Sequence, residues 1–383
     1  MTIFTTQVAI IGAGIQGSAA ARELASRGVD VIVMDAEYPG RHASGVNAGG
    51  VRTLNRHISE LPLALAAKRL WQRIGELVDE DCGYRETGQI QIAIDEESLE
   101  RFQLRREAIL LTGLPHTERL LTPSEVRQLV PYFDGPVAGG AYVADDGYAL
   151  PFHTTQAFRR KAEALGAKFL EGTALKEAYK SVGDWRLQSN NGHEVRATKV
   201  INCTGAWAGE VSKLFGDTLN ITPNGSMQLV TTRLPPFLRL VVGVSGQSMA
   251  AKQFENGTVV IGGGRRSPVD IKTNRADLTL AGLVLAARQA SKFFPILKTA
   301  TIARTWSGIE GFTSDSLPII DFGLASGVLH AAGFSAHGFQ LGPAVGVLLA
   351  DLITTGQSPI SIAPFSSNRF DTPYHASSDT TTS

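Results

Sequence analysis

Three glycines near the N-terminus have the spacing that holds the pyrophosphate of a dinucleotide. They lie in the run Gly12-Ala13-Gly14-Ile15-Gln16-Gly17. The first glycine permits a sharp turn, the second lets the backbone approach the pyrophosphate, and the third lets a helix pack close to a sheet. Asp35 follows 18 residues after Gly17, where a carboxylate can accept hydrogen bonds from both ribose hydroxyls. The motif fits NAD and FAD equally, and the lack of an arginine directly after Asp35 disfavours a 2′-phosphate.

The segments around this motif predict the elements that must position it. Residues 7–11 and 29–34 are short β-rich runs, and residues 18–27 have helical spacing, which together make a βαβ unit. Residues 226–270 alternate like an antiparallel sheet. Glycine-rich loops recur near residues 205, 263, 333 and 338, so both ends of the chain contact the cofactor, which favours the longer FAD. We therefore predict an α/β (α+β two-domain) chain: a Rossmann-like FAD-binding domain with an inserted antiparallel-sheet substrate domain.

Composition excludes several other classes of protein. The 383 residues contain 36 Lys+Arg and 36 Asp+Glu, so the chain lacks the positive field that a nucleic-acid partner requires. Two distant cysteines, Cys82 and Cys203, make neither a disulfide framework nor a zinc site. We expect no metal. The sequence shows neither an apolar run of about 18 residues nor a signal peptide, which predicts a cytoplasmic protein without membrane insertion.

Five segments together resemble the D-amino-acid oxidase superfamily, and within it the glycine oxidase and sarcosine oxidase branch. The nearest resemblance is to the β (B) subunit of bacterial opine oxidases (nopaline or octopine oxidase) and to D-proline or hydroxyproline dehydrogenases. The segments are residues 10–17, 44–52, 202–208, 306–321 (Trp306-Ser307-Gly308 with Ser314-Asp315-Ser316-Leu317-Pro318-Ile319-Ile320-Asp321) and 333–339 (Gly333-Phe334-Ser335-Ala336-His337-Gly338-Phe339).

This resemblance implies a domain division and a set of cofactor contacts. The FAD-binding domain would be discontinuous, over residues 1–80, 140–222 and 300–371, with the substrate domain at 81–139 and 223–299 and a disordered tail at 372–383. FAD would contact Gly12, Gly14, Ile15, Gln16, Gly17, Asp35, Ala36, Ser44, Asn47, Ala48, Gly49, Gly50, Thr204, Gly205, Trp207, Gly308, Gly333, His337, Gly338, Phe339, Gln340 and Leu341.

The resemblance also bears on how the flavin is held. Monomeric sarcosine oxidases tether their flavin to a cysteine in the segment that matches residues 304–314. This chain has no cysteine there, so we expect non-covalent FAD. His153 matches a region that holds FMN at a subunit interface in heteromeric sarcosine oxidases. An FMN beside His153 and a plain surface role for that residue both stay open.

Three residues are candidates for catalysis in the amine oxidation that the resemblance implies, which is hydride transfer from the carbon beside nitrogen to flavin N5, followed by hydrolysis of the imine. Arg52 matches a sarcosine oxidase arginine that binds the substrate carboxylate; the alternative is a surface or phosphate-facing arginine. Glu310 replaces a glycine oxidase arginine, so it would attract a substrate cation instead, unless it pairs with a neighbour such as Arg304. His337 is a candidate for proton transfer or a hydrogen-bonded loop residue.

The favoured substrate is therefore an opine, whose secondary amine carries two carboxylates and, when it is made from arginine, a guanidinium. We expect the catalytic subunit of a heteromeric enzyme, with partner subunits besides the small-molecule substrate. Alternatives are a free-standing glycine or D-amino-acid oxidase, a non-catalytic flavin-containing assembly subunit and, least favoured, a NAD dehydrogenase. The oxygen-activating lysine of monomeric sarcosine oxidase has no evident counterpart, which leaves the electron acceptor open.

Overall fold

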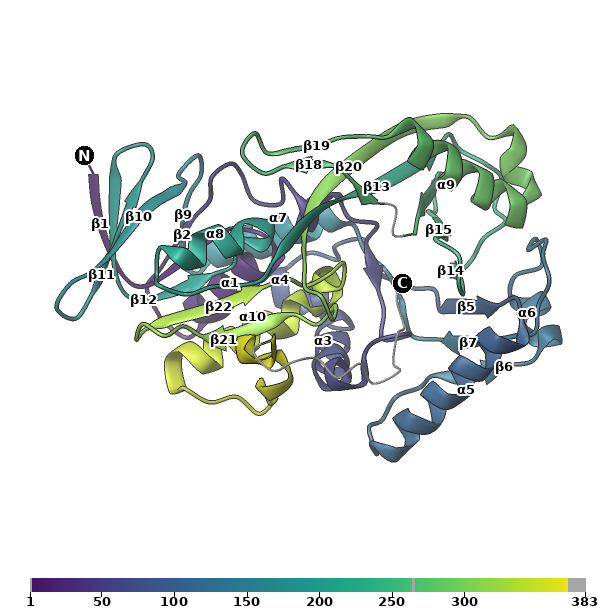
Figure 1. Cartoon of the computed structure of the whole chain (residues 1–383), viewed down its shortest axis with the longest axis horizontal. Coiled ribbons are helices and arrows are strands. Elements are labelled where there is room, and N and C mark those ends of the chain that lie inside the picture. The colour runs from purple at the N-terminus through teal and green to yellow at the C-terminus, as the bar shows by residue number, and fades with distance from the viewer. Residues whose placement is uncertain (1, 264–265, 371–383) are drawn as a thin grey trace.

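The computed structural model describes residues 2–263 and 266–370. The predicted disordered tail, residues 372–383, lies outside the described residues. Two large sheets stand at opposite ends of the molecule, with helices between and around them (Figure 1).

An eight-stranded sheet carries the predicted βαβ unit. β1 (Thr2–Ile11) pairs in parallel with β2 (Val31–Met34), and α1 (Ile15–Ser26) connects them. On its other side β1 pairs in parallel with β12 (His193–Asn202), which pairs in parallel with β22 (Val328–Ala332). The Rossmann-like arrangement is confirmed. The remaining strands of this sheet are β9 (Lys168–Leu170), β10 (Leu175–Lys180), β11 (Trp185–Ser189) and β21 (Ile319–Phe322).

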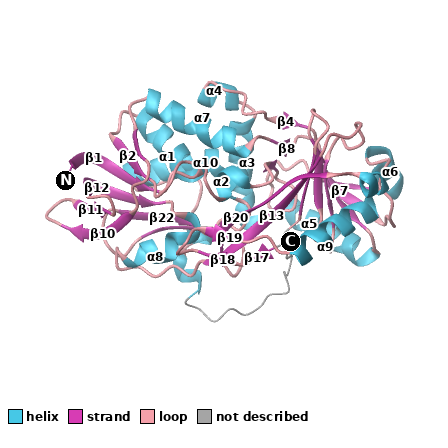
Figure 2. Ribbon diagram, turned by 90° about the horizontal axis from the view of Figure 1, so that it is seen from above, coloured by secondary structure: helices cyan, strands magenta, loops and turns pink. Residues whose placement is uncertain are grey.

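Helices cover both faces of this sheet. α1 packs against α7 (Pro151–Ala164) and α10 (Gly338–Thr355), and α10 also packs against α3 (Leu61–Trp71). Their apolar side chains form one continuous core with the sheet. α8 (Ala208–Lys213) lies on the opposite side (Figure 2), over a second core that includes Trp185 and Phe215.

The helix α10 corrects one expectation from the sequence. Over its 18 residues the mean hydropathy is 1.3, so by length and composition it could cross a membrane. However, 72% of that window is buried inside the structure, and α10 packs against α1 and α3. Such burial is typical of a core helix, whose apolar residues face protein on all sides.

A nine-stranded sheet forms the other half. Its strands are antiparallel, as predicted, except that β14 (Val241–Val244) pairs in parallel with β5 (Gln89–Ala93). α9 (Leu280–Phe293) and α6 (Pro123–Leu129) contribute to the apolar core on one of its faces. β20 (Ile302–Phe312), whose residues were predicted for the FAD-binding domain, pairs along its length with β13 (Thr222–Thr231) in this sheet. The other strands are β6 (Arg119–Leu121), β7 (Gly139–Val143), β15 (Ala250–Gln253), β16 (Val259–Gly262) and β17 (Arg266–Ser267).

Two small sheets, the 16-residue helix α5 and several short helices complete the described chain. β18 (Val269–Asp270) and β19 (Arg275–Ala276) form a hairpin, and β3 (Gly50–Val51), β8 (Gly147–Tyr148) and β4 (Arg85–Glu86) form a three-stranded sheet. The helices are α2 (Ala43–Val46), α4 (Ile74–Val78), α5 (Glu96–Leu111), η1 (Ile58–Glu60), η2 (Gly205–Trp207), η3 (Pro295–Thr299), η4 (Ala363–Phe365) and η5 (Ser367–Phe370).

Candidate active site

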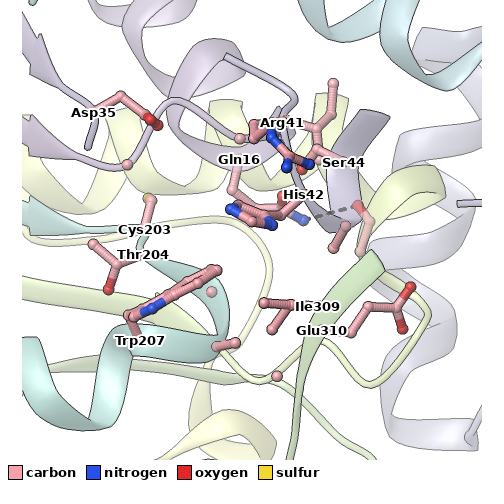
Figure 3. A pocket seen from close by; sticks show the side chains of 18 of the residues that line it. Gln16, Asp35, Arg41, His42, Ser44, Cys203, Thr204, Trp207, Ile309 and Glu310 are labelled. Atoms are coloured by element: carbon pink, nitrogen blue, oxygen red, sulfur yellow. Dashed lines mark hydrogen bonds between the residues drawn. The ribbon is translucent and has the colours of Figure 1, made fainter. Parts of the chain in front are cut away.

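A cavity of about 390 Å³ opens at the carboxyl ends of β1, β2, β12 and β22, where ligands bind in open parallel sheets. The hairpin β18–β19 and the strand β20 border it from the other half of the molecule. Asp35 and Glu310 lie at opposite ends of the lining shown in Figure 3. The cavity therefore suits an elongated ligand that reaches from the first sheet to the second.

The glycine motif forms a cradle that tolerates no larger side chains. A Cβ atom on Gly12, whose φ is +96°, would lie 2.5 Å from the carbonyl oxygen of Cys203. A Cβ atom on Gly17 would lie 1.9 Å from the carbonyl oxygen of Gly12. Gly12 lines the cavity, whereas Gly17 lies behind it and lets α1 approach the turn. Gly14 at the N-terminus of α1 has no side chain to cap the helix, and the hydroxyl of Ser44 accepts a hydrogen bond from the amide of Ile15 at 2.9 Å. This helix end is where a phosphate would meet the helix dipole.

Asp35 lies where a ribose partner is required. Its Oδ2 accepts a hydrogen bond from the amide of Ala13 at 2.7 Å, and its Oδ1 accepts one from the amide of Glu37 at 2.9 Å. Each carboxylate oxygen has a second lone pair, which leaves room for two ribose hydroxyls. The glycine cradle, the N-terminus of α1 and this carboxylate fit the pyrophosphate and ribose of FAD.

Most of the predicted cofactor contacts line the cavity. Those that do are Gly12, Gly14, Ile15, Gln16, Asp35, Ala36, Ser44, Asn47, Thr204, Gly205, Trp207, Gly333, Gly338 and Phe339. The others are not among the lining residues: Gly17, Ala48, Gly49, Gly50, Gly308, His337, Gln340 and Leu341.

The contacts of Gln340 and Gly308 explain why these two residues do not line the cavity. Gln340 is 1% exposed, accepts a hydrogen bond from Arg56 at 3.3 Å and donates one to the carbonyl of Ala64 at 2.8 Å. Gly308 packs against α2, where an added Cβ would lie 2.1 Å from the side chain of Val46. Contacts of such residues with FAD stay a prediction.

The hairpin β18–β19 supplies lining residues that the sequence reasoning missed. The indole of Trp207 donates a hydrogen bond to the carbonyl of Ile271 at 3.0 Å, and Asn274 donates one to Glu37 at 2.9 Å. His42 contacts the ring of Trp207 at 4.7 Å between centroids and Glu37 at 3.2 Å. Burial lowers the pKa of His42. These contacts join residues up to 237 positions apart, and no local motif marks them.

Glu310 projects from β20 into the far end of the cavity. Glu310 is 7% exposed, and its Oε2 has no hydrogen-bond partner among the described residues. Burial raises its pKa to about 7, although a hydrogen bond with Ser226 and the charge of Arg266 oppose the shift. The sequence left open a pairing of Glu310 with Arg304. In the described chain Arg304 is exposed, and the cation that acts on Glu310 is Arg266 instead.

The strand registers place Glu310 on the same face of the nine-stranded sheet as several buried polar side chains. Glu310 pairs with Asn224 and Trp306 with Gln228 across β13 and β20, and paired residues share one face. Gln228 is buried, and its Oε1 also has no partner within the described chain. This face therefore presents acceptors that lack donors.

Lys252, a residue that the sequence analysis did not single out, lies on this face through its pairing with Val260 and that of Val260 with Val230. It is 3% exposed and donates a hydrogen bond to the carbonyl of Ala48. Burial lowers its pKa to about 7. The indole of Trp306 likewise donates to the carbonyl of Val46, at 2.6 Å. The sheet thus holds the loop that follows α2 against the first half of the molecule.

Arg52 and His337 share a charged neighbour, so the fold brings these two predicted residues into one region. His337 Nδ1 lies 3.1 Å from Glu60 Oε2. Alongside the effect of burial, the positive charges of Arg52 and Arg56 lower the pKa of both His337 and Glu60. Arg52 is half-buried and donates through Nη1 to the carbonyls of Leu54, at 2.7 Å, and of Asn55, at 3.3 Å. Glu310 lines the cavity, whereas Arg52 and His337 are not among the lining residues, and the groups that act on Glu310 are Ser226 and Arg266.

The two halves share a crevice, in which one half supplies a glycine-rich βαβ cradle and the other a wall of buried polar side chains. This arrangement is typical of an enzyme that binds a dinucleotide. A family model described as FAD dependent oxidoreductase (DAO) matches residues 7–352. The chain belongs to this family, and it is a flavoprotein enzyme that acts on amino acids or amines.

Its relatives span the whole chain. It is 27% identical to glycine oxidase of Geobacillus kaustophilus over 94% of this chain and 96% of that protein. It is 24% identical to an opine oxidase subunit of Rhizobium meliloti over 96% and 99% of the two chains. The crystal structure of L-proline dehydrogenase from P. horikoshii superposes with a TM-score of 0.89 and 28% identity, over 96% of this chain and 98% of that one.

Proposed function

We propose that this enzyme oxidises a secondary amine of the opine class, in which carboxylates and a cationic arm flank the amine nitrogen. One observation carries the proposal: the carboxyl group of Glu310 is buried at the cavity wall with Oε2 unpartnered among the described residues. A buried acceptor without a donor is destabilising unless a ligand supplies one. A guanidinium or ammonium group is the donor that a carboxylate binds best.

Arg52 would bind a carboxylate of the same substrate. Only its Nη1 is used by the described protein, in hydrogen bonds to two carbonyls. Its Nε and Nη2 are therefore left for a ligand, and together they make the planar fork that fits a carboxylate. Substrates with both charges would meet Glu310 through one group and Arg52 through the other.

Bound FAD supplies the hydride acceptor of this reaction. The cradle and Asp35 would hold its adenosine diphosphate half, which directs the flavin half toward Glu310 and β20. Both cysteines are buried, and burial raises the pKa of Cys82 and of Cys203 to about 12. A protonated thiol is a poor nucleophile, which supports a non-covalent flavin even though Cys203 lines the cavity.

Partner subunits are part of the proposal. A relative whose name marks it as one subunit of an opine oxidase matches over nearly its entire length. The helix α9 exposes the apolar side chains of Leu280 and Val284, at 78% and 57%, and such surfaces are common where another chain docks. His153, which pairs with Glu80 at 2.9 Å and is 47% exposed, is accessible to an FMN at such an interface.

Anaerobic mixing with two opines of one skeleton tests this function. One opine carries a guanidinium arm and the other an uncharged arm, and loss of the oxidised flavin band reports reduction. Both opines should reduce the flavin. Glu310→Gln should raise the dissociation constant of the guanidinium opine roughly 10- to 100-fold, as expected for a hydrogen bond to a charged group, and leave that of the uncharged opine unchanged.

A matched control is Glu97→Gln, which removes an acid whose side chain is 84% exposed on α5. Glu97→Gln should change the dissociation constant of neither opine. If no opine or other secondary amine reduces the flavin, the proposed reaction is wrong. If Glu310→Gln weakens both opines equally, the proposed contact with the cationic arm is wrong.

A further inference from the structure

A buried arginine and a buried glutamate join the segment after Arg52 to the segment that carries His337. Arg56 and Glu60 are 1% and 0% exposed, and Arg56 Nη1 lies 3.3 Å from Glu60 Oε2. Arg56 also donates through Nε to the carbonyl of Arg52 at 3.1 Å and through Nη2 to the carbonyl of His337 at 3.4 Å. One guanidinium thus contacts the main chain of both candidate catalytic residues.

Glu60 fixes which nitrogen of His337 carries hydrogen. Its Oε2 and Oε1 lie 3.1 Å and 3.4 Å from His337 Nδ1. Burial would raise the pKa of Glu60, but the charges of His337 and Arg56 hold it at about 2, so the group is ionised at neutral pH. An ionised carboxylate only accepts hydrogen bonds. Nδ1 is therefore the protonated nitrogen.

The other nitrogen of His337 is left as an acceptor. Burial, together with the charges of Arg56 and Arg52, lowers the pKa of His337 to about 4 although Glu60 opposes the shift, so the ring is neutral. The hydrogen-bonding contacts of its ring to described residues are made through Nδ1 and not through Nε2, and the side chain is 16% exposed. The neighbours Ala336 and Gly338 line the cavity.

The backbone before His337 is held in an unfavourable conformation. Ser335 and Ala336 have φ values of +50° and +66°, a region that residues with a Cβ rarely occupy. The hydroxyl of Ser335 accepts a hydrogen bond from the amide of Thr313 at 3.1 Å, which fixes this turn from the end of β20. Strain of this kind persists where the surroundings enforce it, and it concentrates at functional sites.

We propose that Arg56 and Glu60 are positioning residues, which hold His337 as the neutral Nδ1–H tautomer so that Nε2 accepts a hydrogen bond from the N–H of the substrate amine. The inference rests on the proposed amine oxidation. The substrate must present a neutral amine with its lone pair free to assist loss of hydride, and an acceptor for its N–H orients it without protonating it. A charged imidazolium would instead donate a hydrogen bond to the amine nitrogen and would occupy the lone pair that assists loss of hydride.

The first test needs no substrate and measures the wild-type ring directly. In the holoenzyme with 15N-labelled histidine, the ring nitrogens of His337 are assigned by comparison with His337→Asn. At neutral pH we expect a neutral ring with hydrogen on Nδ1. An Nε2–H tautomer, or a charged ring, overturns the proposal.

The second test compares two carboxylates that each contact a buried histidine. Glu60→Gln keeps the shape at His337 but removes the charge that selects the tautomer. Asp217→Asn makes the same change at Asp217, whose Oδ2 lies 2.9 Å from Nε2 of His330, a pair outside the cluster around Arg52. Glu60→Gln should slow anaerobic flavin reduction roughly 10-fold or more, the usual effect of removing the carboxylate behind a functional histidine, and should populate both tautomers. Asp217→Asn should do neither.

The outcomes separate this inference from the proposed function. Reduction of the flavin by an opine at equal rates in the wild type and in Glu60→Gln contradicts only the role of Glu60. A chain that no amine reduces contradicts the proposed function while the tautomer measurement stands by itself. If Glu60→Gln does not fold, Arg56→Lys, which keeps a cation beside Glu60 but loses the fork to both carbonyls, replaces it with the same expected slowing.

Discussion

Replacing Glu310 with glutamine should make the stability of the protein depend less on pH. Burial raises the pKa of Glu310 from its ordinary 4.5 to about 7, so the folded chain holds a proton that the unfolded chain releases. The contribution of Glu310 to stability is therefore fully present below about pH 4.5 and is lost as the pH rises through 7. The glutamine side chain carries no charge at any of these pH values, so the variant escapes this loss.

The size of the effect follows from the two pKa values. At roughly 1.4 kcal/mol for each pH unit between them, ionised Glu310 destabilises the folded state by about 3 kcal/mol above pH 7. A chain of this length has an unfolding entropy of roughly 0.8 kcal/mol/K, so the corresponding shift in melting temperature is about 4 °C.

The assay is a set of melting temperatures with excess FAD, from about pH 5 to about pH 8. The melting temperature of Glu310→Gln minus that of the wild type should rise by about 3 °C across this range, because part of the full effect is already present at about pH 5. Glu97→Gln, which removes an exposed acid, corrects for the change in net charge and should show no such trend. A difference that stays constant with pH refutes the assignment of Glu310 as a buried acid that ionises near neutrality.

Two further variants test the cradle and the sheet. Gly17→Ala places a Cβ atom 1.9 Å from the carbonyl oxygen of Gly12, so we expect most of the FAD to be lost on gel filtration. Gly75→Ala, at a position with nothing within 4 Å, should keep its flavin, and equal retention by both would contradict the cradle. Lys252→Met should give the opposite pH trend to Glu310→Gln, because burial lowers the pKa of Lys252 to about 7 and the charged amine destabilises the fold only at lower pH. Its melting temperature relative to the wild type should fall as the pH rises above 7, and a rise would contradict the assignment.

The local motif allowed the nucleotide end of the site to be predicted from the sequence. Gly12, Gly14 and Asp35 lie within one βαβ unit, where chain geometry alone fixes their relation. The position of Glu310 at the cavity wall followed from the family resemblance, since alternation along β20 predicts which residues share a face but not which face meets the crevice.

The remaining site residues depend on contacts that no short stretch of sequence encodes. Glu60 precedes an apolar helix and has the features of an ordinary acid at a helix start, yet it is fully buried against His337, 277 positions away. A lysine in a β-strand is typical of an exposed edge strand, but Lys252 lies on β15, which is between β14 and β16 inside the sheet. Arg56 and Glu60 are four residues apart, but Arg56 precedes the helix η1, so the helical i,i+4 spacing does not predict their ion pair.

The proposed doubly charged substrate would use polar groups that the described protein leaves unpartnered in two separate places. The sheet wall at Glu310 and Gln228 has acceptors without donors in the described chain, whereas Arg52, near His337, has donors that the described protein leaves unused. A glycine-sized substrate has only one carboxylate and would leave Glu310 unpaired, at a cost of about 1–3 kcal/mol for a buried polar group without a partner. A proposed substrate with a cation on one arm and a carboxylate on the other would supply a partner to Glu310, which lines the cavity, and to Arg52, which lies beside the His337 segment. Its length would then have to match the separation of these two side chains.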